Sequence, residues 1–254
     1  MTTVEPFTPV KSADRTLEVL EVLAASRTRR SLVDLARALD IPKSSLHGIL
    51  RTMARRGWVE TDPTGTRFGL GVRALEVGAA YLEADDAVGL VSGVLDDLSR
   101  QFGEAVHLGR LDGPDVVYLA KRDSVHRLRL YSAIGRKLPA HATALGKALL
   151  ARCPDPDGQL RWPLPRLTDH TITDRDALHR ELERTRDRGY AVDREENTEG
   201  IICFAVTVPL GEPPTDAISI SVPAARIGPE SEERIAGALV RATDPLRAAR
   251  SMFS

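Results

Sequence analysis

The segment from residue 39 to 60, LDIPKSSLHGILRTMARRGWVE, is the part of the sequence that most restricts the fold. Its apolar residues recur at helical spacing, which predicts one helix with a single buried stripe made of Leu46, Ile49, Leu50 and Met53. The residues between them are cations and hydrogen-bond donors, and Gly57 supplies the left-handed residue that ends many helices. Such a helix fits either a groove of nucleic acid or an ordinary solvated surface, so its neighbours have to decide.

Charge is distributed unevenly along the chain. Residues 1–78 contain 12 Lys and Arg against 9 Asp and Glu, a net charge of +3, whereas the remainder contains 23 against 27, a net charge of −4. Within residues 27–56 the count is 8 basic against 2 acidic residues, or +6. A basic segment on an otherwise acidic chain indicates one end that faces a polyanion and another end with a different task.

Length and composition narrow the class of protein. The 254 residues are enough for two domains or one large one, and the fractions of 42% hydrophobic and 28% charged residues are those of a globular protein. No apolar run approaches the ~20 residues that span a bilayer, and the N-terminus has no apolar core of a secretion signal. Cys153 and Cys203 provide neither a disulfide framework nor metal-ligand spacing. We therefore expect a cytoplasmic protein without a membrane segment, a metal or another cofactor.

Two further helix patterns precede the opening segment, at residues 12–26 and 31–40. The second begins with Ser31 followed by Asp34, a short-armed form of the capping box. After Gly57, residues 58–60 and 67–70 have the pattern of two strands joined by the turn Asp62-Pro63-Thr64-Gly65. Three helices followed by a hairpin predict a winged helix-turn-helix, with residues 43–56 as the recognition helix.

The predicted DNA contacts come from two elements. Hydroxyls and amides near a helix start bind phosphates or base edges, lysine adds charge, and the arginine fork matches guanine. The candidates are Lys43, Ser44, Ser45, His47 and Arg51 on the recognition helix, and Arg67 on the wing. A solvated polar surface is the alternative for each, most of all for His47.

The rest of the sequence alternates between helix and strand patterns. Helices are expected over 72–87, 91–103, 143–151, 174–189 and 232–250, strands over 104–113, 115–123, 126–135, 190–193, 203–210 and 217–223, and a Pro- and Asp-rich loop over 152–170. Several antiparallel strands flanked by helices predict an α+β domain. We expect a DNA-binding domain at 10–71, a linker helix at 72–87 and a second domain at 88–254.

A small polar pocket is predicted in the second domain. Thr143 is a candidate N-cap, and the two-residue strand period puts Ser219 and Ser221 on one face, with Cys203 on another strand. The alternatives are a cysteine that is a small core residue, serines bonded to backbone or water, and an Asp193 that caps or pairs at the surface. We expect His141 to order its loop.

An enzyme or redox sensor using Cys203 is the competing function. A catalytic triad is spatial and leaves no fixed spacing in a sequence, so composition does not exclude it. The sequence contains no Gly-x-Ser-x-Gly elbow, phosphate loop or metal pattern, and its six histidines are scattered. The strand context of Cys203 predicts burial, which disfavours a reactive thiolate.

Five segments in order, PKSSLHGILRTMARRGWVE, RFGLGVRALEVG, PAHATALGKALLA, RGYAVDREENTEGIICFAV and AISISVP, resemble the IclR-type (isocitrate lyase regulator) transcription factors across nearly the whole chain. The resemblance implies a GAF-like α/β effector domain behind the winged helix-turn-helix, with the first and last helices of that domain packed behind its sheet. It implies binding to double-stranded operator DNA as a homodimer or a dimer of dimers. It also implies a small organic or aromatic acid held at Ala144, Leu145, Asp193, Cys203, Ser219 and Ser221.

Two positions depart from the family pattern. Members commonly carry an arginine directly after the histidine of the recognition helix, where this chain has Gly48. We expect base preference to depend more on Arg51 and the wing as a result. Leu145 stands where small residues are frequent, which predicts a narrower pocket or a different ligand.

Overall fold

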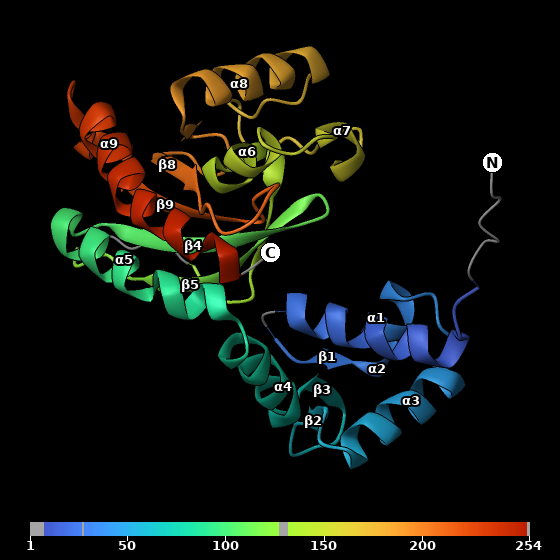
Figure 1. Ribbon diagram of the computed structural model, residues 1–254. Helices are drawn as coiled ribbons and strands as arrows, with labels where there is room; N and C mark the ends of the chain where they lie inside the picture. The colour runs from blue at the N-terminus through green and yellow to red at the C-terminus, as the bar shows by residue number, and fades with distance from the viewer. Residues whose placement is uncertain (1–7, 27, 127–131, 253–254) are drawn as a thin grey trace, which may run out of the picture. The chain divides into compact units, whose positions relative to one another are not determined.

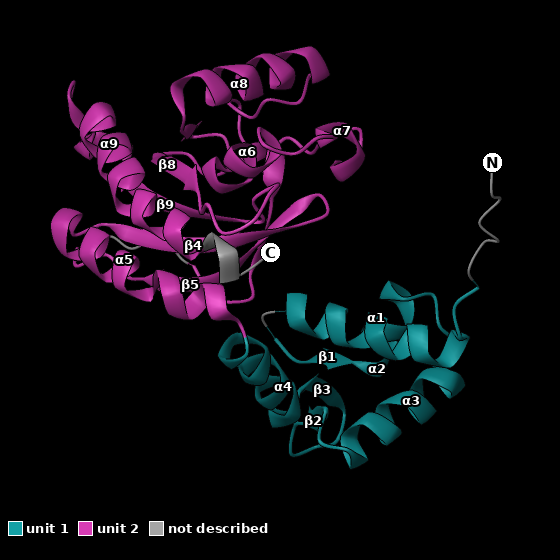
Figure 2. Ribbon diagram, viewed as in Figure 1, with its two compact units in different colours: residues 1–84 teal, residues 85–254 magenta. Residues whose placement is uncertain are grey.

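The computed structural model describes residues 8–26, 28–126 and 132–252. Residues 1–84 and 85–254 form two compact units, which we call unit 1 and unit 2 (Figures 1 and 2). Within the described ranges, no helix combines the length and the apolar composition needed to cross a membrane.

Unit 1 is a three-helix core followed by a hairpin and a fourth helix. Its helices are α1 (Lys11–Ala25), α2 (Leu32–Ala38), α3 (Lys43–Arg55) and α4 (Val72–Glu83), and its hairpin strands are β2 (Val59–Thr61) and β3 (Arg67–Leu70). The core takes at least one residue from each of the first three helices and from the hairpin, among them Val19, Leu35, Leu46, Leu50, Met53, Val59 and Phe68. The helix-turn-helix and wing predicted from the apolar spacing are thus confirmed.

Local signals set the ends of these helices. The Ser31 hydroxyl accepts the Asp34 N–H at 3.2 Å and the Asp34 carboxylate accepts the Ser31 N–H, so the predicted capping box is present. Gly57 has φ +75°, the left-handed conformation expected after α3. The sequence pattern missed β1 (Arg30–Ser31), which pairs with β3 and makes the sheet three-stranded in the order β1-β3-β2.

The helix expected over 72–87 is shorter than predicted. It ends at Glu83, and α5 (Asp86–Phe102) begins three residues later. The reason is Asp85, whose carboxylate accepts the N–H groups of Ala87 and Val88 and so starts a new helix.

Unit 2 is built on a six-stranded sheet whose neighbouring strands are all antiparallel. The strand order is β6-β5-β4-β9-β8-β7. The strands are β4 (Ala105–Asp112), β5 (Asp115–Arg122), β6 (Lys137–Pro139), β7 (Ala191–Arg194), β8 (Ile201–Thr207) and β9 (Asp216–Pro223). Half of the strand expected over 126–135, residues 127–131, lies outside the described residues, and the described half, residues 126 and 132–135, is not strand.

Helices cover both faces of this sheet (Figure 1). On one face α5 and α9 (Ser231–Thr243) lie together, so the first and last helices of the unit pack behind the sheet as expected. On the other face α6 (Ala144–Leu150) packs against β8, β9 and β7, with α8 (Arg175–Arg188) outside it and the short α7 (Pro156–Gln159) nearby.

The last helix differs from the prediction of one helix over 232–250. The α-helix ends at Thr243, and a 3₁₀-helix continues over Asp244–Met252. Pro245 accounts for the change, because it has no N–H for an α-helical bond and its ring crowds the preceding turn.

The two faces of the sheet carry different residues. Along β9, Ile218, Ile220 and Val222 alternate with Ser219 and Ser221, and all five are buried. Since successive side chains point to opposite faces, the branched apolar residues share the face of α5 and α9. The serines face α6, where small side chains leave room beside the sheet.

Candidate functional site

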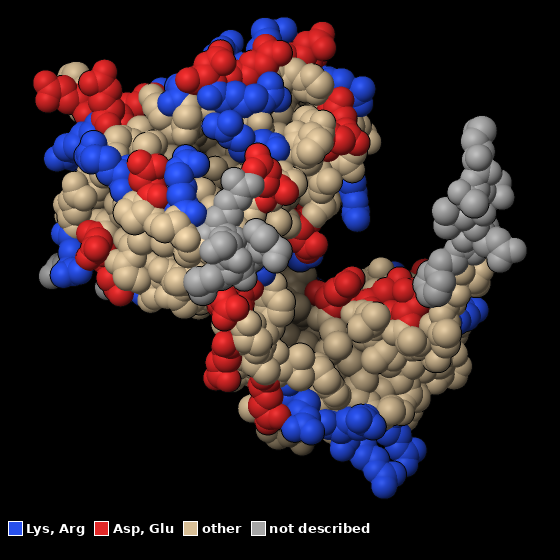
Figure 3. Space-filling view, in the orientation of Figure 1, with Lys and Arg blue, Asp and Glu red and all other residues tan. Residues whose placement is uncertain are grey.

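Helix α3 has a buried stripe and an exposed arc. Its three fully buried apolar residues lie in the core of unit 1, and the helical period places Ser44, Gly48, Arg51 and Arg55 on the opposite side. Lys and Arg side chains gather along this helix at the lower edge of Figure 3. An exposed, donor-rich helix face of this kind matches the width and charge of the DNA major groove.

All five candidate contacts on α3 are exposed: Lys43, Ser44, Ser45, His47 and Arg51. Ser45 lies on one flank of the arc, where it lines a groove between α3 and α1 together with Thr52. The candidate set omitted Arg55, which is exposed and stands one turn after Arg51. Its i+4 spacing from Arg51 was the available signal.

The wing carries the sixth candidate, Arg67, at the start of β3. Its guanidinium donates to the Arg29 carbonyl oxygen at 3.5 Å, so the side chain lies along β1. The hairpin turn is held by Asp62, whose carboxylate accepts the N–H groups of Arg67 and Thr66 at 2.9 Å each. Hydrogen bonds from the Arg67 N–H and the Thr64 hydroxyl keep the pKa of Asp62 below its ordinary value.

The second candidate site is a small cavity on the α6 face of the sheet in unit 2. All six residues predicted to hold an effector line it: Ala144, Leu145, Asp193, Cys203, Ser219 and Ser221. Strand register explains part of this convergence, because Cys203 pairs with both Ser221 on β9 and Asp193 on β7. The Cys203 thiol donates to the Ser221 hydroxyl at 3.3 Å. The tertiary structure therefore brings together residues that are up to 77 positions apart.

Helix α6, beside the cavity, packs very closely against the segment that precedes it. Thr143 caps α6, since its hydroxyl accepts the Gly146 N–H at 3.0 Å, as the sequence predicted. A Cβ at Gly146 would lie 2.1 Å from the Ala140 carbonyl oxygen, so only glycine allows this packing. His141 contacts the Pro165 carbonyl oxygen through Nε2 at 3.0 Å, which ties its loop to the following segment.

Asp193 is buried, with 2% of its surface exposed, and it does not pair at the surface as one alternative supposed. Its Oδ1 accepts the Glu196 N–H at 2.7 Å and the Asn197 N–H at 3.4 Å. Burial, followed by repulsion from the Glu196 carboxylate, raises the pKa of Asp193 to about 7. This carboxyl group thus exchanges its proton near neutral pH, at the wall of a cavity.

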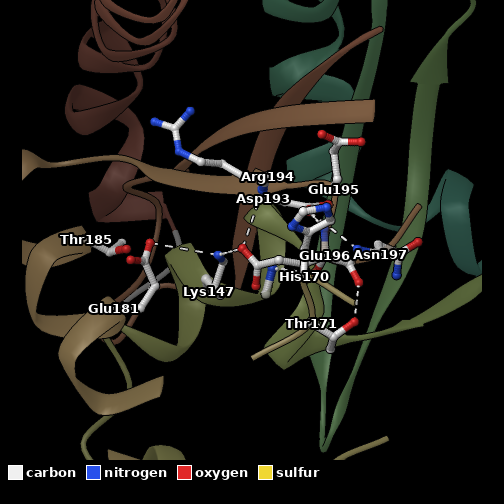
Figure 4. A network of polar contacts seen from close by, with 12 residues as sticks. Lys147, His170, Thr171, Glu181, Thr185, Asp193, Arg194, Glu195, Glu196 and Asn197 are labelled. Carbon is white, nitrogen blue, oxygen red and sulfur yellow. Dashed lines mark hydrogen bonds and ion pairs between the residues drawn. The ribbon is translucent and has the colours of Figure 1, made fainter. Parts of the chain in front are cut away.

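A buried ion network that the sequence analysis missed lies next to Asp193 (Figure 4). Lys147 of α6 is fully buried and forms a charged hydrogen bond with Glu196, while Glu181 of α8 lies 3.8 Å from its Nζ. Arg188 binds the same Glu181 at 2.8 Å. Lys147 and Glu196 are 49 residues apart, so their pairing leaves no local pattern in the sequence.

The cavity is small. Its volume of about 30 Å³ holds about two water molecules. A carboxylic acid of even a few heavy atoms requires the walls to move apart, and Leu145 forms part of these walls. Thr143, predicted as the cap of α6, also lines the cavity, and the six remaining lining residues were not predicted: Tyr118, Arg136, Leu138, Asn197, Thr198 and Ile201.

The chemistry of Cys203 does not suit nucleophilic catalysis or redox sensing. Burial, followed by the nearby Asp193 carboxylate, raises the pKa of the thiol far above its ordinary value. The thiolate that such reactions require is therefore strongly disfavoured.

Comparison with known proteins gives two family matches that together cover most of the chain. Residues 12–63 match the IclR helix-turn-helix domain, and residues 79–247 match the bacterial transcriptional regulator IclR C-terminal domain. The HTH-type transcriptional regulator XynR of Escherichia coli strain K12 is 34% identical over 202 residues, which are 78% of this chain and 80% of that protein.

Solved structures agree with these matches. A putative transcriptional regulator, RHA06195 from Rhodococcus sp. RHA1, superimposes with a TM-score of 0.80 at 30% identity and covers 97% of this chain and 100% of its own. An IclR homolog from Microbacterium hydrocarbonoxydans, complexed with 4-hydroxybenzoate, has a TM-score of 0.78 at 24% identity, covering 95% and 99%. At 24% identity, the similarity to the Microbacterium protein shows the fold alone.

Proposed function

Because the chain belongs to the IclR family of bacterial transcriptional regulators, we propose that α3 contacts operator DNA and that the α6 cavity binds the effector. The protein is a DNA-binding regulator with an effector-binding C-terminal domain; its relatives are named as regulators, and it is not an enzyme. The observation that carries the assignment of the effector site is that all six residues implied by the family resemblance line one cavity.

On the DNA side, each exposed residue has a role that its chemistry supports. Ser44 and Ser45 bind phosphates or base edges beside the start of α3, and Lys43 adds positive charge there. The fork of Arg51 reads guanine in the major groove, and His47 flanks it one turn earlier. Arg55 extends this surface.

The sixth candidate DNA contact lies on the wing. Arg67 binds a phosphate, and its position along β1 supports a contact to the backbone rather than to bases.

On the effector side, a small organic or aromatic acid is the ligand class. Asp193, Cys203, Ser219 and Ser221 provide the polar contacts, and Ala144 and Leu145 limit the size of the ligand. The similar fold from Microbacterium, complexed with 4-hydroxybenzoate, supports an acid in this class of domain. Since the cavity holds about two water molecules, binding the acid is coupled to a wider form of the domain.

The chain acts as a homodimer or homotetramer in the cytoplasm, where it meets its operator. In unit 1, the linker helix α4 has no buried residue and exposes Val72, Leu75, Val77 and Tyr81. Exposed apolar side chains on both sides of a helix support contact with a second copy. An effector that prefers one arrangement of the two copies changes the spacing of their α3 helices and so the affinity for a two-fold operator.

The DNA assignment is tested by gel mobility shift with the fragment upstream of the protein's own gene, at fixed salt and with excess non-specific DNA. Arg51→Ala should weaken specific binding by about 1–3 kcal/mol, or roughly 5- to 150-fold. Arg241→Ala removes an exposed arginine from α9 in unit 2 and is the charge-matched control. Equal affinity of wild type and Arg51→Ala would exclude Arg51 from the interface. If wild type shows no shift, selection from random DNA identifies the operator for the same comparison.

The effector assignment is tested on the same shift with candidate acids added one at a time. Ser221→Ala removes one hydroxyl from the cavity wall and should reduce the response to the active acid by up to about tenfold, because one hydrogen bond to the ligand is lost. An unchanged titration would exclude Ser221 from the ligand site.

A further inference from the structure

One residue that lines the cavity carries a hydrogen-bond donor that nothing among the described residues satisfies. Asn197 lines the cavity, and its Nδ2 is buried without a partner in the described part of the chain. The other end of the same amide is occupied, because the Thr198 hydroxyl donates to Oδ1 at 3.2 Å. A buried polar group without a partner costs free energy comparable to a lost hydrogen bond, so it indicates that a ligand atom completes the site.

The turn that carries Asn197 is stabilised by hydrogen bonds between its own residues. Asp193 Oδ1 accepts the N–H groups of both Glu196 and Asn197, and Glu195 between them has φ +63°. Lys147 of α6 pairs with the Glu196 side chain and so ties the turn to a second element, as Figure 4 shows. The position of Asn197 therefore does not depend on a flexible loop.

Two threonines from the loop before α8 hold the same turn. Thr168 donates its hydroxyl to the Glu195 carbonyl oxygen at 2.7 Å, and Thr171 donates to the Glu196 carbonyl oxygen at 2.7 Å. These bonds fix the backbone of residues 195–197, and the Asn197 side chain is itself bonded through Oδ1 to the Thr198 hydroxyl. A backbone fixed in this way limits where the Asn197 amide can lie.

An amide N–H binds an acceptor, and the surrounding residues indicate which kind. Arg136 lines the same cavity and brings a positive charge, which favours an anionic oxygen over a neutral one. Asp193 supplies an acceptor in the same wall and suits a hydroxyl of the ligand. The lining thus offers a donor and a positive charge to a carboxylate, and an acceptor to a hydroxyl.

We propose that Asn197 is a specificity-determining residue that donates its Nδ2–H to a carboxylate oxygen of the effector, with Arg136 contributing positive charge to the same cavity. This proposal rests on the proposed function of the cavity. It assigns a contact outside the six residues named above and requires the effector to bind as a carboxylate.

The test is isothermal titration calorimetry on the full chain. The probes are 4-hydroxybenzoate, benzoate, lactate and acetate, each beside its neutral alcohol counterpart. The tightest-binding acid on wild type is then titrated into the variants. Asn197→Ala should weaken it about 10- to 100-fold, because a hydrogen bond to a charged group is lost. Asn197→Asp keeps the shape but adds a negative charge, so it should weaken the acid further and affect the neutral alcohol less.

Glu199→Gln is the matched control, since residue 199 is exposed and lies outside the lining. Its affinity for the acid should stay within twofold of wild type, and thermal unfolding checks that every variant is folded. Unchanged binding in both Asn197 variants, with Ser221→Ala weakened, overturns the role of Asn197 and leaves the proposed function intact. Preferential binding of a neutral alcohol overturns the carboxylate assignment. Absence of binding by every acid overturns the acid effector itself, and the Asn197 proposal with it.

Discussion

Helices α3 and α6 carry the two proposed binding surfaces, and they bury their residues in opposite ways. Helix α3 keeps only three of its residues fully buried and exposes its cations and hydroxyls. Helix α6 is buried along all seven residues, including Lys147. A large, rigid, charged partner such as DNA needs donors that already reach solvent. A small ligand needs polar groups taken out of water, each of which must find a partner inside the protein or in the ligand.

This difference predicts where substitutions will be most destructive. In unit 1 most polar side chains are solvated, so their loss costs little folding free energy. In unit 2 several polar groups are buried, so the loss of one partner leaves the other buried without a hydrogen bond or counter-charge. The following experiments test that contrast, beginning with the largest expected effect.

Lys147→Met should destabilise unit 2 by about 3–5 kcal/mol, because it leaves the buried Glu196 and Glu181 without their shared cation. The measurement is the free energy of unfolding in urea. Arg184→Met is the matched control: Arg184 binds the same Glu181 at 3.3 Å, but its side chain is 65% exposed. That change should cost no more than about 1 kcal/mol. Similar small losses in both variants would contradict the contrast between buried and solvated ion pairs.

His107 on β4 should make the stability of unit 2 depend on acidity. It is fully buried, stacks on Tyr118 at 4.6 Å between ring centroids, and has no hydrogen-bond partner for either nitrogen among the described residues. Burial, followed by the positive charge of Lys121, lowers the pKa of His107 to about 4. The unfolded chain therefore binds the proton first as the pH falls, and stability decreases between pH ~6.5 and pH ~4.

Between these limits wild type should lose about 3 kcal/mol more than His107→Phe, which keeps the stacked ring but has no proton to gain. Urea unfolding at pH 7 and pH 4 measures the difference. Tyr118→Phe retains the histidine and should behave like wild type. Parallel pH profiles for wild type and His107→Phe would show that His107 is not held neutral.

Ser31→Ala should cost unit 1 about 1 kcal/mol, because it removes the hydroxyl that caps α2. Thermal unfolding of unit 1, followed by circular dichroism, detects the shift. Ser44→Ala, an exposed serine on α3, is the control with no expected loss of stability. A larger effect at Ser44 than at Ser31 would reverse the assignment of the cap.

Gly48→Ala should have the smallest effect and the opposite sign. A Cβ at this position meets nothing within 4 Å, so alanine stabilises α3 by about 0.5–1 kcal/mol through lower flexibility of the unfolded chain. Thermal unfolding gives the size of the gain. A loss of stability would mean that the helix requires glycine here for packing.

The fold was largely predictable, because its signals are local. Apolar spacing located α3, a serine and an aspartate located the start of α2, and Gly57 located the end of α3. Errors occurred where a neighbouring residue overrode the pattern. Asp85 started a new helix before the expected linker ended, and Pro245 changed the last helix to a 3₁₀-helix. The two-residue strand β1 was missed, because two residues are too few to show a period.

The two candidate sites also differ in how far local sequence signals predict them. The amino-acid sequence by itself determined which face of α3 is exposed, since exposure on a helix follows from a 3.6-residue period within one short segment. Only the tertiary structure decided the pairing of Lys147 with Glu196, the burial of His107 and the unsatisfied amide of Asn197. Those features depend on which distant segments pack together and on whether a polar group finds a partner there. No local periodicity encodes either outcome, because both arise from the packing of α6 and its loops against the sheet.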